Sequence, residues 1–145
     1  MKITIAFMVL LLLCSGCKRF DAEEYYALSE ETVSEVIIDY TKINGDYSSI
    51  KRVVLNEGKS IGEFLLYFNK TEVNKLTRMV TRSTTSSAEV SVFQGDEKLR
   101  FDIGLIEEQK GYIRFLTERG VSSKFHGEKP ATKFAKYVFS LLPND

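Results

Sequence analysis

Few side chains in this chain of 145 residues could carry out chemistry. His126 is the only histidine, and Cys14 and Cys17, the only cysteines, lie near the N-terminus. A metal site that combines histidine with cysteine therefore cannot form in the region after Cys17. A serine hydrolase would need His126 as its base, but the sequence has no Gly-x-Ser-x-Gly turn to present a nucleophile. We therefore predict no catalytic residue, no metal ligand and no cofactor.

The adjacent carboxylates Glu107 and Glu108 are the next candidates, because glycoside hydrolysis uses two carboxylates that converge on one bond. Neighbouring residues of a strand point to opposite faces, so this pair does not converge. Arg100 and Asp102 alternate with apolar positions, and we expect them to face water or a cross-strand partner. The sequence thus favours binding over catalysis.

The basic segment 119–129 is the strongest candidate for a binding site. It is bracketed by glycines, and its apolar residues follow neither a helical nor a strand period that would bury them. Loops that carry aromatic and basic residues on a rigid scaffold often bind partners. The alternative is that Phe125 packs beneath the last helix as part of the core. The predicted partner-binding residues are Val121, Lys124, Phe125, His126 and Lys129.

Hydrophobic periodicity predicts the elements that position this segment. A first helix is expected over 30–43, with Ser29 as its N-cap, and its acidic face (Glu31, Glu35 and Asp39) is a second candidate site. Strands at 50–55 and 63–68 would form a hairpin, and a second helix would follow from Val73 to about Thr81.

A meander of three strands is expected next, at 88–92, 99–105 and 112–117, before an irregular stretch and a last helix from Pro130. The order α-β-β-α-β-β-β-α predicts an α+β fold in which about three helices pack on a small antiparallel sheet. The periodicities assign these residues to the core: Val36, Ile37, Leu66, Phe101, Ile103, Phe134 and Val138.

Formal charge is zero overall but unevenly placed. Acidic residues dominate 21–46 and basic residues dominate 110–145, so either the two regions face each other or each has an oppositely charged partner. Nucleic acid is not expected as a partner, because there is no basic stripe with interleaved aromatic residues.

The N-terminal segment bears on location. Lys2 precedes an apolar run of about ten residues, whereas a membrane span needs roughly 20. Two small residues, Ser15 and Gly16, stand directly before Cys17. This ending resembles a bacterial lipobox, although Cys14 occupies the usual leucine position. The resemblance implies cleavage before Cys17 and acylation of its sulfur.

These features predict a signal peptide at 1–16, a lipidated tether at 17–28 and a single domain at 29–145. The protein would be held in the bacterial cell envelope through acylated Cys17. Lipoproteins that stay at the inner membrane typically carry aspartate after the acylated cysteine, and this chain has Lys18 there. In a cell with two membranes, the resemblance therefore implies the outer membrane, with the domain facing the periplasm. We expect a non-catalytic module that binds a protein partner, as an inhibitor, immunity protein or accessory of envelope assembly. The alternatives are a small-ligand binder, with a pocket between sheet and helices, and a hydrolase with dispersed catalytic residues.

Overall fold

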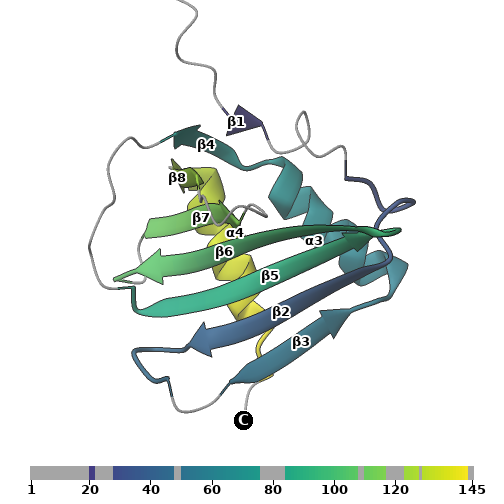
Figure 1. The fold of residues 1–145 in the computed structure, drawn as a ribbon. Coiled ribbons are helices and arrows are strands. Elements are labelled where there is room, and N and C mark those ends of the chain that lie inside the picture. The colour runs from purple at the N-terminus through teal and green to yellow at the C-terminus, as the bar shows by residue number, and fades with distance from the viewer. Residues whose placement is uncertain are drawn as a thin grey trace, which may run out of the picture.

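The computed structural model describes residues 20–21, 28–47, 50–75, 84–107, 110–116, 123–127 and 129–143. Eight antiparallel strands form one sheet in the order β1-β4-β8-β7-β6-β5-β2-β3, and the two helices α3 and α4 lie on the same face of it (Figure 1). The elements are β1 (Phe20–Asp21), β2 (Glu35–Lys42), β3 (Lys51–Leu55), α3 (Gly58–Asn69), β4 (Glu72–Lys75), β5 (Ser86–Gln94), β6 (Glu97–Ile106), β7 (Lys110–Leu116), β8 (Ser123–Gly127) and α4 (Lys129–Ser140).

The predicted element order and the prediction of about three helices are wrong, since the described residues contain two helices. The largest error is the first helix, because its region contains β2, paired with β3 on one side and β5 on the other. Val36, Ile38 and Tyr40 are fully buried, which is a period of two. Ser29 accepts the amide hydrogen bonds of Thr32 and Val33 and so closes a turn instead of capping a helix.

The predicted strand 63–68 is also wrong, because this stretch belongs to α3. Phe64 and Phe68 are buried one helical turn apart, and Leu66 between them, which was predicted to be in the core, is 54% exposed. The second predicted helix starts instead as the short strand β4, and 76–81 lie outside the described residues.

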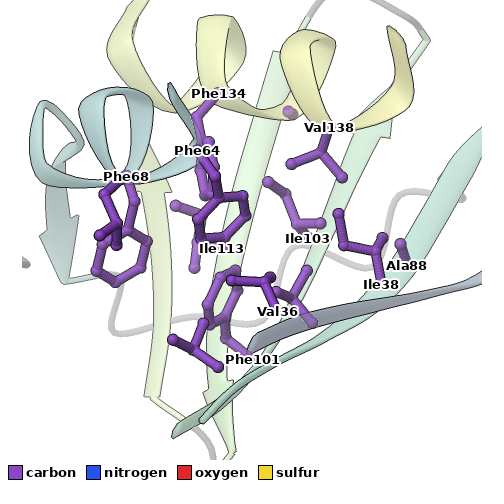
Figure 2. Packing of buried hydrophobic residues seen from close by; sticks show 14 of the residues in the cluster. Val36, Ile38, Phe64, Phe68, Ala88, Phe101, Ile103, Ile113, Phe134 and Val138 are labelled. Atoms are coloured by element: carbon purple, nitrogen blue, oxygen red, sulfur yellow. The ribbon is translucent and has the colours of Figure 1, made fainter. Parts of the chain in front are cut away.

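The meander and the last helix occur where the sequence places them, as β5, β6, β7 and α4. Aromatic residues of α3, β6 and α4 fill the layer between the sheet and the helices (Figure 2). The Phe68 ring lies 5.4 Å from Phe101, and the Phe64 ring lies 5.3 Å from Phe134. The alternative prediction of a small-ligand binder expected a pocket in this same layer, between the sheet and the helices.

Five of the seven predicted core residues are fully buried, and two are not. Ile37 is half-buried on the other face of the sheet, and Leu66 is exposed because α3 turns it away from the core. The fully buried five are Val36, Phe101, Ile103, Phe134 and Val138.

Candidate functional site

Part of the predicted binding loop is a strand. Residues 123–127 form β8, which pairs with β4 and β7. A segment without hydrophobic periodicity can form a paired strand because the hydrogen bonds between strands come from the backbone. The register sets Lys124 opposite Arg114, Phe125 opposite Ile113 and His126 opposite Tyr112.

The predicted site residues therefore do not share one loop. Lys129 is the first residue of α4 and lies with the helices, whereas Lys124, Phe125 and His126 are positions of the sheet. Val121 and the lipidation candidate Cys17 lie outside the described residues. The second candidate, an acidic helix face, does not form, because Glu35 and Asp39 belong to β2 and Glu31 to a turn.

We call the face of the sheet turned away from α3 and α4 the outer sheet face (Figure 1). It carries a row of charged side chains. The register aligns the row across five strands, from β3 to β7: Arg52, Asp39, Glu89, Asp102 and Arg114. Three carboxylates thus stand side by side, an arrangement that is destabilising unless cations neutralise it.

Three arginines supply that neutralisation. Arg52 donates to both carboxylate oxygens of Asp39, at 2.6 and 3.0 Å. Arg100 donates to Oε1 of Glu89 from two of its nitrogens, and Arg114 pairs with Asp102. With Arg100 counted as part of the row, three arginines balance three carboxylates. The side chains of Arg52 and Arg100 remain 62% and 46% exposed, so both can also contact a partner.

Apolar and aromatic side chains flank the charged row on the outer sheet face. Ile37 lies opposite Val54, which is 43% exposed, and Gly104 lies opposite Tyr112. Gly104 has no Cβ, and the Tyr112 ring occupies the space that a Cβ would take. Burial, followed by the nearby Asp102 carboxylate, raises the pKa of the Tyr112 hydroxyl, which therefore stays protonated at neutral pH.

The carboxylates of the row share one feature. Each accepts hydrogen bonds from a guanidinium group. Within the part of the chain that the structure describes, no group of three histidine, cysteine or acidic residues could hold a metal ion.

A second surface lies on the opposite side of the molecule, between the outward sides of α3 and α4. It is a groove of about 710 Å³ around the stacked rings of Tyr67 and Tyr137, whose centroids are 4.3 Å apart. Leu66 forms part of its lining. Four lysines also line it, Lys70, Lys129, Lys133 and Lys136, and we call it the lysine groove.

The lysines of the groove have no paired carboxylate among the described residues. None of its four lysines forms a salt bridge among the described residues, and α4 carries no acidic residue from Lys129 to Ser140. Burial, followed by the charge of Glu63, raises the pKa of Tyr137 to about 12. The lysine groove therefore combines neutral aromatic rings with ammonium groups that form no salt bridge to another described residue.

Of the four lysines of this groove, the sequence predicted only Lys129 as a site residue, and it assigned that residue to the binding loop. Lys129, Lys133 and Lys136 recur at helical spacing on the side of α4 opposite Phe134 and Val138, and that periodicity could have revealed half of the groove. The half on α3 was hidden by the prediction of a strand there.

Comparisons with protein-family models, with curated proteins and with solved structures find no match to this chain. None of the helices that the structure describes is long and apolar enough to cross a membrane.

Proposed function

We propose that this protein is a lipid-anchored, non-catalytic binding protein of the bacterial cell envelope, and that a protein partner docks on the outer sheet face. The observation that carries the proposal is the row of arginine–carboxylate pairs flanked by Ile37, Val54 and Tyr112.

The residue types on this face support a protein partner over other ligands. Arginine and tyrosine are enriched in the cores of protein interfaces, and lysine is depleted there. The row has no net charge, which disfavours a polyanion. Small ligands prefer concave pockets, whereas this surface presents side chains across five adjacent strands.

The anchor in this proposal is an acyl-modified Cys17, and its test is independent of the partner. Replacing Cys17 by serine should leave the precursor unprocessed and unacylated. Cys14→Leu, which brings the segment closer to the usual lipobox, should be processed at least as well as the natural sequence. Entry of labelled fatty acid into the Cys17→Ser protein would contradict the assignment.

The partner is tested by capture from envelope extract with the acylated protein in detergent. Reversing two exposed charges, Arg52→Glu with Arg100→Glu, should weaken capture about tenfold or more, because both guanidinium groups would contact the partner. The matched control reverses two charges elsewhere, Lys59→Glu with Lys133→Glu, and should leave capture unchanged. Equal capture by both variants would reject the outer sheet face, provided that their melting temperatures agree.

A further inference from the structure

We infer that the lysine groove is a docking surface for anionic phospholipid headgroups, which turns the outer sheet face away from the membrane. This inference rests on the proposed acyl anchor and adds an orientation to it.

The first argument is the position of the tether. Phe20 and Asp21 of β1 pair with Val73 and Glu72 of β4, and β4 begins shortly after Lys70, at the end of α3. Cys17 precedes Phe20 by three residues, which span no more than about 11 Å. An acyl chain on Cys17 would therefore enter the membrane close to the Lys70 end of the groove.

The second helix brings more lysines to the same end. β8 pairs with β4 and ends at Gly127, so α4 starts at Lys129 beside the strand that holds β1. Figure 1 shows β1, β4 and β8 together at the end of the molecule where α4 begins. Lys129 and Lys133 occupy the first two turns of α4, next to the tether.

The third argument is the chemistry of the groove. Exposed ammonium groups without carboxylate partners are attracted to an anionic membrane surface, and tyrosine rings favour the headgroup region. Here four lysines, none with a salt bridge to another described residue, surround the Tyr67–Tyr137 stack, with Leu66 beside it. An acidic protein could also meet such charges, but the nearby tether favours the lipid surface.

The inference can be tested by lysine footprinting on the acylated full-length mature protein in vesicles. An amine-reactive reagent that does not cross membranes is applied to protein in phosphatidylcholine vesicles and in mixed phosphatidylcholine–phosphatidylglycerol vesicles. Labelling of Lys70, Lys129, Lys133 and Lys136 should fall at least about threefold in the mixed vesicles. Lys98, which is exposed on the outer sheet face, serves as the internal control and should be labelled equally in both. High salt should abolish the difference.

A pair of double variants sharpens the test. Lys129→Glu with Lys133→Glu should remove the protection of Lys70 and Lys136, whereas Lys98→Glu with Lys110→Glu, on the outer sheet face, should preserve it. Equal labelling of the groove lysines in both vesicle types would overturn the inference. So would protection that appears only when envelope proteins are added, because the occupant would then be an acidic protein. Flotation with neutral vesicles tests the acyl anchor separately, since it does not depend on lipid charge.

Discussion

The outer sheet face and the lysine groove lie on opposite sides of one small domain. They differ in whether their cationic side chains are paired with carboxylates. On the sheet, strand register brings each of three arginines to a carboxylate. On the helices, four lysines have no carboxylate partner among the described residues. A guanidinium group matches a carboxylate as a rigid fork, whereas an ammonium group is a flexible and strongly hydrated point charge. The zero net charge of the chain therefore includes paired charges on the outer sheet face and, among the described residues, unpaired lysines in the groove.

The largest expected effect is on the stability of the whole domain, because one aromatic core supports both surfaces. Phe101→Ala or Phe134→Ala should lower the free energy of unfolding by about 3 to 5 kcal/mol, since both rings are fully buried. Denaturant unfolding measures the loss. Leu66→Ala is the control, and it should cost far less because Leu66 is exposed. A similar cost for all three variants would mean that the buried side of α3 is misassigned.

A smaller change should disturb the outer sheet face alone. Gly104→Ala places a Cβ against the Tyr112 ring and should destabilise the domain by about 1 to 3 kcal/mol. In the matched control, Gly62→Ala, the new Cβ meets the flexible Glu30 carboxylate, which can move away. This control should be neutral or slightly stabilising, because alanine favours a helix. Thermal melting of both variants decides the point, and equal melting temperatures would argue against the packing of Tyr112 on Gly104.

The contrast between paired and unpaired cations can be measured directly. Asp102→Asn should destabilise the domain by about 1 to 2 kcal/mol, because Arg114 is partly buried and its Nε has no described hydrogen-bond partner. Lys133→Ala should change stability by less than about 0.5 kcal/mol, as expected for an exposed charge without a partner. If the lysine substitution costs as much as the aspartate substitution, the groove lysines take part in folding.

The smallest effect concerns alkaline pH. Tyr40 donates a hydrogen bond to the Val138 carbonyl at 2.5 Å, and burial, followed by Tyr137, raises its pKa above the ordinary value. A raised pKa means that stability is fully present below pH ~10 and is lost as the pH rises further. Tyr40→Phe should therefore cost about 1 kcal/mol at neutral pH and flatten the alkaline decline. An unchanged decline would point to other groups, such as Tyr137.

The sequence predicted correctly those elements whose hydrophobic spacing fits either a helix or a strand but not both. The alternating residues of β5 to β7 and the stripe of Phe134 and Val138 gave correct strands and a correct helix. The region of β2 fits two periods, because Val36, Ile37 and Tyr40 recur at helical spacing while Val36, Ile38 and Tyr40 alternate. Pairing with the distant strand β5 decides between them, and no local pattern contains that information.

The candidate surfaces were harder to predict than the elements. The expectation that Arg100 and Asp102 face cross-strand partners is confirmed by their pairs with Glu89 and Arg114. The full row also depends on the placement of β2 between β3 and β5, so it could not be predicted while that segment was assigned to a helix. The lysine groove likewise needs α3, which the alternation of Phe64, Leu66 and Phe68 concealed.

The central claim is that the outer sheet face binds a protein and the lysine groove binds lipid headgroups. Site-specific photocross-linking in cells tests it most directly. A photoreactive residue replaces Val54 on the outer sheet face or Leu66 at the lysine groove, two apolar positions that are 43% and 54% exposed. The position of Val54 should give a discrete protein adduct, and the position of Leu66 should give lipid adducts without one. A discrete protein adduct at the position of Leu66 and none at that of Val54 would contradict the account.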